Sequence, residues 1–475
     1  MLLFTAVLNI MRETISEKRA SMKLQKNLST TQIIALGFFC AILTGTLLLS
    51  LPIASADGKM TSAVDALFTA TTSVCVTGLV VVPTYLHWSL FGKIVILILI
   101  QLGGLGIISF TTGIMMVIGR KITLRDRLLL EDALNLDTLS GLVAFLRKIF
   151  RRTFIVEGIG AVCYAFVFVP EYGILRGIWY SVFHCISAFC NAGIDLLGDS
   201  SLAAYLTNPW MNLVTMVLII LGGTGYIVWD DMLRIFSEIR QSRIRPSQCF
   251  HKFHLHTKLV LLTTGFLIVF GTVLIFCLEY TNKNTIGNLN FFEKLLASMF
   301  QSVTTRTAGF LTFSQTNMRG TTVLVCMFLM FIGGSSIGTA GGIKTTTFAI
   351  LVLSTLSTVK GQKHLVAFHK TVPHKTVQKA LAVTAVSFVV LCIAILTLSV
   401  VEKGSLTDIA YEVTSAIATV GLSRDYTAKL HLAGKIIIIL CMYLGRIGPI
   451  SMAIAISNRE KPSLLSYPHE DVTVG

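Results

Sequence analysis

The chain contains the octapeptide Thr72-Ser73-Val74-Cys75-Val76-Thr77-Gly78-Leu79, and three similar octapeptides follow it at nearly equal intervals. They are Ser187-Ala188-Phe189-Cys190-Asn191-Ala192-Gly193-Ile194, Val303-Thr304-Thr305-Arg306-Thr307-Ala308-Gly309-Phe310 and Ser415-Ala416-Ile417-Ala418-Thr419-Val420-Gly421-Leu422. Their glycines, Gly78, Gly193, Gly309 and Gly421, lie 115, 116 and 112 residues apart, and an apolar residue follows each one. Regular spacing of this kind indicates an internal repeat.

A second glycine pattern keeps the same period. It consists of the triplets Leu102-Gly103-Gly104, Leu221-Gly222-Gly223, Ile332-Gly333-Gly334 and Leu444-Gly445-Arg446. Their first glycines lie 25, 29, 24 and 24 residues beyond the octapeptide glycines. Because two markers stay in register over four units, we predict that the chain consists of four copies of one structural unit.

The composition places these units in a membrane. Of 475 residues, 53% are hydrophobic and only 13% are charged, whereas charged residues make up about a quarter of a soluble domain. The mean hydropathy is +0.76. These values predict a polytopic membrane protein, and they exclude a collagen, a disordered chain and a disulfide-rich scaffold.

Apolar segments long enough to cross a bilayer core of about 30 Å recur along the chain. They lie at residues 33–53, 91–118, 153–170, 211–229, 259–279, 321–359, 381–401 and 433–456. The sixth is interrupted by a Gly-rich stretch at 333–342. Shorter apolar segments lie at 62–74, 176–189, 290–304 and 406–418. We predict that these are re-entrant half-helices, which need surrounding protein or a water-filled cavity.

Charge predicts the orientation of the chain, whose net charge is +15. The segments 119–152, 231–258 and 359–379 carry an excess of Lys and Arg, so the positive-inside rule places them and both termini in the cytoplasm. Residues 1–31 and 457–475 are then cytoplasmic tails. The first is not expected to be a signal peptide, because its apolar patch precedes its basic residues, the reverse of the order in a signal peptide. An alternative start at Met22 stays open.

Four half-helices entering from outside would point their C-terminal ends, which carry partial negative charge, at a common axis. A glycine in each loop permits positive φ and can turn carbonyl oxygens inward. A ring of such oxygens can replace the hydration shell of a monovalent cation. Ordinary close packing of glycines in membrane helices would explain one such loop, but four in register favour a pore.

The chain resembles the membrane subunit of the Trk/Ktr/HKT potassium transporters, KtrB type. The matching stretches are TTSVCVTGL (71–79), FCNAGIDLLG (189–198), QSVTTRTAGF (301–310), GGSSIGTAGGIKTTTF (333–348), ATVGL (418–422) and LGRIGPISM (444–452). The resemblance covers roughly residues 30–456. It implies an all-α integral membrane fold of four pseudo-symmetric helix–pore loop–helix repeats, with eight transmembrane helices around one pore. The repeats would span residues 32–120, 121–232, 233–359 and 360–456.

The resemblance also implies a function. The chain is expected to take up K⁺ across the plasma membrane, with Na⁺ as activator and no covalently bound cofactor. Expected partners are a second copy in a homodimer, a cytoplasmic KtrA-type ring that binds nucleotide, and membrane lipid, but no nucleic acid. An enzyme is not expected, because no catalytic cluster lies at one depth.

Carried over to this sequence, the selectivity filter that coordinates K⁺ comprises Val76, Thr77, Gly78, Asn191, Ala192, Gly193, Thr307, Ala308, Gly309, Thr419, Val420 and Gly421. Gly78 favours potassium, since a serine in the first loop of the plant relatives goes with sodium preference. Asn191 departs from the small hydroxyl residues of the first and third loops. We therefore expect weaker selectivity than in a channel with four identical filter strands.

The resemblance places a gate in the interrupted segment. It comprises Gly333, Gly334, Ser335, Ser336, Gly338, Gly341, Gly342 and the pore-facing Arg446. A broken helix is tolerated at membrane depth beside a water-filled cavity, so a hinged plug is expected, although a static kink stays open. A cation at the depth of Arg446 costs about 2.5–3.5 kcal/mol. We expect a latch on the loop carbonyls, or else a structural tie between two helices.

Four other charged residues lie near these segments. Arg306 would either set the field at the outer mouth or brace against a half-helix carboxylate. Lys344 is expected to reach the inner surface as an anchor, and Asp65 and Asp408 are expected to cap half-helices.

The alternatives are an alternating-access cation symporter and a sodium-conducting relative. A symporter usually shows inverted repeats and intramembrane carboxylates. Here the repeats share one orientation, and Glu157, Asp230 and Glu279 are expected near the ends of spans. These features favour the pore.

Overall fold

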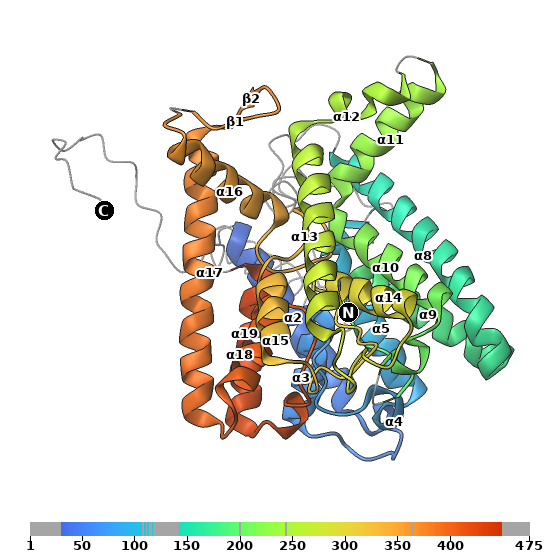
Figure 1. Ribbon diagram of the computed structural model, residues 1–475. Coiled ribbons are helices and arrows are strands. Elements are labelled where there is room, and N and C mark those ends of the chain that lie inside the picture. Colours follow the sequence, from blue (N-terminus) through green and yellow to red (C-terminus); the bar gives the residue numbers. More distant parts are fainter. Residues whose placement is uncertain are drawn as a thin grey trace, which may run out of the picture.

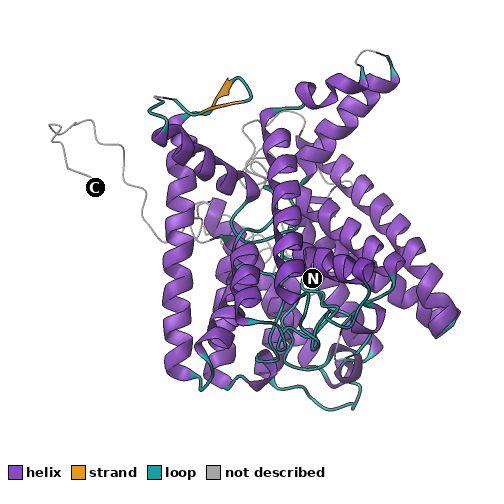
Figure 2. Cartoon of the chain, in the orientation of Figure 1, coloured by secondary structure: helices purple, strands orange, loops and turns teal. Residues whose placement is uncertain are grey.

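The computed structural model describes residues 30–106, 109–110, 112–113, 116, 142–198, 201–242, 245–362 and 364–448. The described chain is mostly helical, as Figure 2 shows, with one small hairpin of β1 (Val366–Ala367) and β2 (Lys370–Thr371). The C-terminal tail, Met22 and all but the last two residues of the N-terminal tail lie outside the described residues, as does most of the basic segment 119–152.

Each unit begins with a long helix, continues with a short helix and ends with a third helix (Figure 1). The long helices are α2 (Thr30–Ser50), α8 (Leu142–Tyr172), α13 (Leu255–Glu279) and α17 (His374–Val401). The short helices are α3 (Ala63–Val74), α9 (Ile174–Cys190), α14 (Phe291–Thr304) and α18 (Leu406–Ile417). The third helices are α5 (Leu90–Leu105), α10 (Pro209–Thr224), α15 (Gly320–Phe331) and α19 (Leu432–Ile447). All four short helices begin and end within two residues of the predicted half-helices.

Smaller elements connect these helices. They are η1 (Pro52–Ala54), α4 (Thr84–His87), η2 (Ala203–Tyr205), α11 (Tyr226–Arg240), η3 (Pro246–Gln248), α12 (Cys249–Lys252), α16 (Thr345–Val359) and η4 (Thr427–Lys429). Helices α11 and α12 and the β1–β2 hairpin lie at one end of the molecule, and α4 lies at the other (Figure 1). The basic segments 231–258 and 359–379 therefore share one end.

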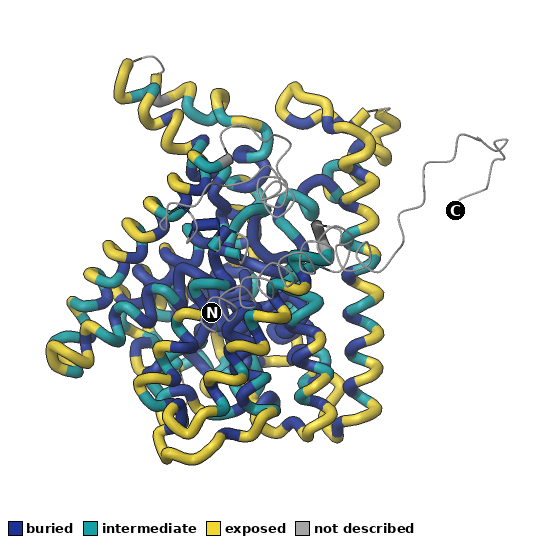
Figure 3. The backbone as a smooth tube through the Cα atoms, turned by 180° about the vertical axis from the view of Figure 1, so that it is seen from behind, coloured by how far each residue is buried: buried dark blue, intermediate teal, exposed yellow. Residues whose placement is uncertain are grey.

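Among the described residues, four helices are long and apolar enough to cross a membrane, namely α2, α8, α13 and α17, and a fifth span results if α10 and α11 count as one. Large apolar side chains point outward from these helices, among them Leu47, Phe166, Val269 and Val400. Buried residues gather in the centre of the molecule and exposed ones at its periphery (Figure 3). An apolar periphery around a buried centre is what a lipid bilayer requires, so the chain is a multi-pass membrane protein.

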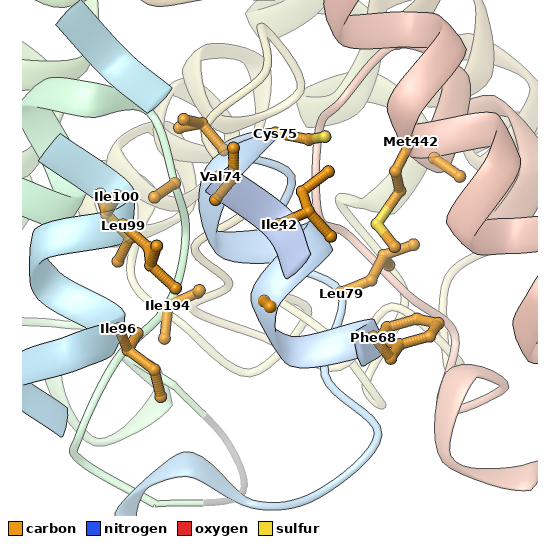
Figure 4. Close-up of a cluster of buried hydrophobic side chains, with 14 of the residues drawn as sticks. Ile42, Phe68, Val74, Cys75, Leu79, Ile96, Leu99, Ile100, Ile194 and Met442 are labelled. Carbon is orange, nitrogen blue, oxygen red and sulfur yellow. The ribbon is translucent and has the colours of Figure 1, made fainter. Parts of the chain in front are cut away.

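The short helices lie inside the protein. Side chains from three other helices, including Ile42 of α2, Leu99 of α5 and Met442 of α19, surround α3 (Figure 4). In α18 every residue from Ile409 to Ile417 except Ala410 is buried. This packing meets the condition for non-spanning backbone at membrane depth, because protein rather than lipid surrounds it.

The third helices are broken more often than the sequence analysis predicted. Helix α5 stops before Gly106, α10 before Gly225 and α19 before Gly448, with φ of 82°, 87° and 92° at these glycines. The chain bends by 100° between α10 and α11. The predicted spans 91–118, 211–229 and 433–456 therefore each contain a glycine at which a helix ends. A positive φ ends the i→i−4 ladder, and glycine adopts it without a Cβ clash.

The three breaks share one position in the repeat. Each glycine follows the first glycine of its LGG-type triplet by three residues, as in Gly222 and Gly225. The signal was present in the sequence as the last glycine of LGGLG, LGGTG and LGRIG. In the third unit the same place falls at Ser336, within the 333–342 loop. The loop thus enlarges a break that the other units also contain.

Glu157 corrects a second prediction. It lies in the middle of α8 and is buried, and Gln101 Nε2 donates to its two carboxylate oxygens at 3.0 and 3.2 Å. The expectation that it lies near the end of a span was wrong, because α8 begins at Leu142 rather than near residue 153. A buried carboxylate in the middle of a long apolar helix is a feature that alternating-access symporters also show.

Candidate functional site

The four loops that follow the short helices share one backbone conformation. Each loop glycine has positive φ: 94° at Gly78, 64° at Gly193, 81° at Gly309 and 93° at Gly421. The residue two positions earlier also has positive φ: 56° at Val76, 60° at Asn191, 66° at Thr307 and 51° at Thr419. The positive φ at this second position was not predicted from the sequence. A left-handed β-branched residue costs about 1–3 kcal/mol, so the surrounding structure must enforce it.

The four glycines form a closed ring of contacts. A Cβ atom placed on any one of them would overlap the carbonyl oxygen that precedes the glycine in the next loop. The pairs are Gly78 with Ala192, Gly193 with Ala308, Gly309 with Val420 and Gly421 with Thr77. The cycle runs through the loops in chain order and returns to the first. Loops more than a hundred residues apart therefore meet around one point.

A hydroxyl group from each short helix holds its own loop. Thr72 Oγ1 accepts from Gly78 N at 2.9 Å, and Ser415 Oγ accepts from Gly421 N at 3.0 Å. In the other two loops the hydroxyl donates instead, from Ser187 to Ile194 O at 2.6 Å and from Thr304 to Phe310 O at 2.5 Å. The sequence analysis did not assign these residues. Their signal was a hydroxyl residue five or six positions before each loop glycine.

Three buried threonine hydroxyls in the loops, those of Thr77, Thr307 and Thr419, have no hydrogen-bond partner among the described residues. The side-chain amide of Asn191 is oriented to donate within the protein, to Ala188 O at 3.0 Å and to Ile219 O at 3.3 Å. The second loop thus keeps its polar side chain hydrogen-bonded within the protein, which sets it apart from the other three.

The first glycines of the LGG-type triplets bring the third helices against the short helices. A Cβ atom on Gly103, Gly222 or Gly445 would overlap the carbonyl oxygen of Val74, Phe189 or Ile417, in that order. Each of these oxygens belongs to the residue four positions before the loop glycine. In the third unit Gly333 instead packs on the carbonyl oxygen of Gly341, within its own loop.

Replacing Gly222 with alanine should therefore destabilise the protein. The added methyl group overlaps the Phe189 carbonyl, and overpacking of this kind costs about 1–3 kcal/mol. The measurement is the melting temperature of the detergent-solubilised protein by size-exclusion chromatography. Gly265→Ala is the matched control, because no atom lies within 4 Å of a Cβ at that helical position. Equal melting temperatures for the two variants would contradict the packing role.

The 333–342 loop lies against the break between α10 and α11. Ser335 N donates to Gly223 O at 2.8 Å, Thr339 N donates to Gly222 O at 3.2 Å, and Tyr226 N donates to Ile337 O at 3.0 Å. The loop therefore bonds the backbone groups that the bend sets free, which are costly to leave unpaired at membrane depth. On its other side, Gly341 packs against Thr419 and the carbonyl of Ala418 in the fourth loop.

Arg446 connects this loop to another unit. Its guanidinium donates to Thr339 O at 2.6 Å and also to Gly103 O of α5. The first bond is the predicted contact with the loop carbonyls, and the second ties α19 to α5. The two alternatives of the sequence analysis therefore coexist in one side chain.

The model of the TrkH family, described as cation transport protein, matches residues 4–467. This chain belongs to the TrkH family. It is 40% identical to the potassium/sodium uptake protein NtpJ of Enterococcus hirae, over 97% of this chain and 100% of that protein. It is also 40% identical to the Ktr system potassium uptake protein B of Bacillus subtilis, over 94% of this chain and 96% of that protein. The predicted resemblance to the KtrB type is thus confirmed.

A crystal structure of the potassium transporter TrkH from Vibrio parahaemolyticus is similar to this structure. The TM-score is 0.68 at 18% sequence identity, and the match covers 89% of this chain and 84% of that chain. At this identity the likeness establishes the fold. A TrkH-type fold agrees with the expected class of mostly helical membrane proteins.

Three charged side chains of this TrkH-family chain differ from their predictions, and a fourth, Asp408, agrees in part. Lys344 does not extend to the surface, because its Nζ donates to Ala340 O at 2.7 Å. Arg306 does not pair with a half-helix carboxylate or face the outer mouth, because its Nη2 donates to Gly333 O at 3.2 Å. Asp65 and Asp408 lie in the first turns of α3 and α18; Asp65 does not cap its helix, whereas Asp408 accepts from the hydroxyl of the N-cap residue Ser405 at 2.6 Å. They pair with Lys435 at 2.7 Å and Arg424 at 2.5 Å, respectively.

Proposed function

We propose that this chain takes up potassium across the plasma membrane through a pore whose filter is the ring of four loops, residues 76–78, 191–193, 307–309 and 419–421. The observation that carries the proposal is the closed cycle of glycine–carbonyl contacts. Such a cycle concentrates carbonyl oxygens around one point, and a ring of these oxygens can replace the hydration shell of a monovalent cation. The left-handed residues and the hydroxyl tethers keep the loops in this conformation.

Potassium is favoured over other cations by three features. The filter residues carry no carboxylate that a divalent ion would require. All four filter positions are glycine, including Gly78 in the first loop. Two relatives that match nearly the whole chain are named as a potassium/sodium uptake protein and a potassium uptake protein. We further propose that sodium promotes uptake. The alternative function of the same pore is conduction of sodium.

The gate of this pore is proposed to be the 333–342 loop with Arg446. Two contacts support this role. The loop packs directly against the fourth filter loop at Gly341, and its attachment to α10 and Arg446 uses backbone hydrogen bonds that water can replace. A static kink in the helix would not require the Arg446 guanidinium to donate to the Thr339 carbonyl oxygen in the middle of the loop. We infer that the loop closes the path below the filter and swings aside when the pore conducts.

The assembly proposed is a homodimer with one pore per subunit, controlled by a cytoplasmic nucleotide-binding ring. The name of the Bacillus relative, a Ktr system protein, supports a system of several components. The basic segments 231–258 and 359–379 meet at one end of the molecule (Figure 1), which suits both a cytoplasmic docking surface and anionic lipid. Both chain termini are proposed to lie on this side.

Growth and rubidium uptake at low potassium test the function. The host is a bacterium without its own potassium importers, with and without sodium and a Ktr-type regulatory subunit. We expect rescue by the unsubstituted chain and its complete loss in Gly309→Arg, since the side chain would enter the ring. Gly320→Arg is the control, because Gly320 is exposed and has no atom within 4 Å of a Cβ.

One further variant separates the pore from the symporter. An alternating-access mechanism coupled through the buried Glu157 would lose uptake in Glu157→Gln. A pore should retain uptake, since glutamine keeps the size and a hydrogen bond to Gln101. Uptake that is abolished in Glu157→Gln and unaffected in Gly309→Arg would refute the proposed pore.

A further inference from the structure

Arg306 occupies a position where the other loops have small side chains. It stands three residues before Gly309, and the matching residues are Cys75, Cys190 and Ala418. Only 7% of its surface is exposed. A buried guanidinium is costly unless hydrogen bonds or a counter-charge compensate it. One loop of the ring therefore contains a permanent cation that the filter chemistry does not require.

The surroundings of Arg306 show what it serves. Its Nη2 donates to the carbonyl oxygen of Gly333, the residue at which α15 has ended and the 333–342 loop begins. Its Nη1 is buried without a partner, and no carboxylate pairs with Arg306 in the described part of the chain. Beside it lies a cavity of about 10 Å³, lined also by Gly223 and Gly334. A space of this size is close to the minimum that one water molecule needs, and it lies between the third filter loop and the start of the 333–342 loop.

We propose that Arg306 is a positioning residue that latches the first residue of the 333–342 loop and couples this loop to the third filter loop. The inference rests on the proposed function. Arg446 holds the loop at Thr339, whereas Arg306 holds it at Gly333. Because Thr307 follows Arg306 directly, a shift of the third filter loop moves the guanidinium and with it the start of the 333–342 loop. Ion occupancy of the filter and opening of the gate are thereby linked.

The third and fourth units divide this task in a complementary way. The third unit carries arginine in its filter loop and Gly334 in the 333–342 loop that follows α15. The fourth carries Ala418 in its filter loop and Arg446 at the position matching Gly334. Both arginines donate to carbonyls of the same loop segment. A hydrogen bond from a charged donor shifts an equilibrium by about tenfold or more, so each latch is strong enough to bias the loop toward its docked position.

The first test is a cycle of two changes with rubidium uptake as readout. Arg306→Met should raise uptake several-fold in the intact chain and have no further effect after deletion of residues 335–340. A residue that supports only the filter would change uptake by the same factor in both backgrounds, and that result would overturn the proposal. Arg176→Met, at the exposed start of α9, is the matched control and should leave both rates unchanged.

A second readout does not depend on transport. Ser336→Cys places a thiol on the 333–342 loop, at a half-buried position. Its rate of modification by a membrane-impermeant thiol reagent is measured in inside-out vesicles. The reference is the chain that lacks the Ser336→Cys substitution. Arg306→Met should raise the modification rate about tenfold. Arg306→Lys, which keeps the charge and loses the planar fork, should give a smaller rise and serves if the methionine variant does not reach the membrane. An unchanged rate in both variants would overturn the latch. Absence of uptake by the unsubstituted chain would instead refute the proposed function.

Discussion

Substitution of Gly78 by serine is expected to lower the preference for potassium over sodium by about tenfold. Gly78 has φ of 94°, and a Cβ atom at this position would overlap the carbonyl oxygen of Ala192 in the next loop. Backbone strain of this kind amounts to about 1–3 kcal/mol, and about 1.4 kcal/mol corresponds to a factor of ten. Relief of the overlap must move the Ala192 carbonyl, so one side of the oxygen ring loses its spacing.

Competition between sodium and rubidium uptake measures this preference. Gly58→Ser is the matched control, because Gly58 also has positive φ, at 66°, but no atom lies within 4 Å of a Cβ there. The control should keep the selectivity of the unsubstituted chain, which shows that strain alone outside the ring has no effect. Unchanged selectivity in Gly78→Ser, with protein present in the membrane, would count against the filter assignment.

Deletion of residues 335–340 is expected to raise the uptake rate about tenfold or more. The deletion removes the backbone bonds of Ser335, Ile337 and Thr339 to the α10–α11 break, together with the acceptor of Arg446. Loss of one hydrogen bond from a charged donor already shifts an equilibrium by about tenfold. The chain can close after the deletion, because Gly333 and Gly341 are already in contact.

Initial rates of rubidium uptake, normalised to protein in the membrane, test the deletion. The same deletion combined with Gly309→Arg should show no uptake, because ions that bypass the gate must still pass the ring. An unchanged or lower rate in a well-expressed deletion would argue against the plug. A raised rate that survives Gly309→Arg would show a leak outside the proposed pore.

The short helices and their loops were predictable because their signals are local. A mostly apolar run of 12 residues that ends in a glycine loop sets both the length of α3 and the place where it stops. The positive φ of Gly78 follows from the same few residues. By contrast, the left-handed conformation of Val76 could not be predicted. A β-branched residue avoids that region by itself, and only the packing of the neighbouring loops enforces it.

The breaks of the third helices were partly predictable from the sequence. The glycines at 106, 225 and 448 were visible at one position of the repeat, yet glycine is common inside membrane helices and does not by itself end one. Whether the helix continues depends on partners for the freed backbone groups. The 333–342 loop provides those partners at Gly225, and it comes from a different unit of the chain.

The sequence alone determined where the short helices lie and how regularly they recur, because periodic glycines and apolar run lengths are properties of neighbouring residues. It did not determine what Arg306, Lys344 and Glu157 contact. Each of these side chains can satisfy its charge in several ways, and the choice depends on which carbonyl or amide the folded units bring within reach. Tertiary structure selected Gly333, Ala340 and Gln101, since burying a charge at membrane depth leaves only the nearest polar partner.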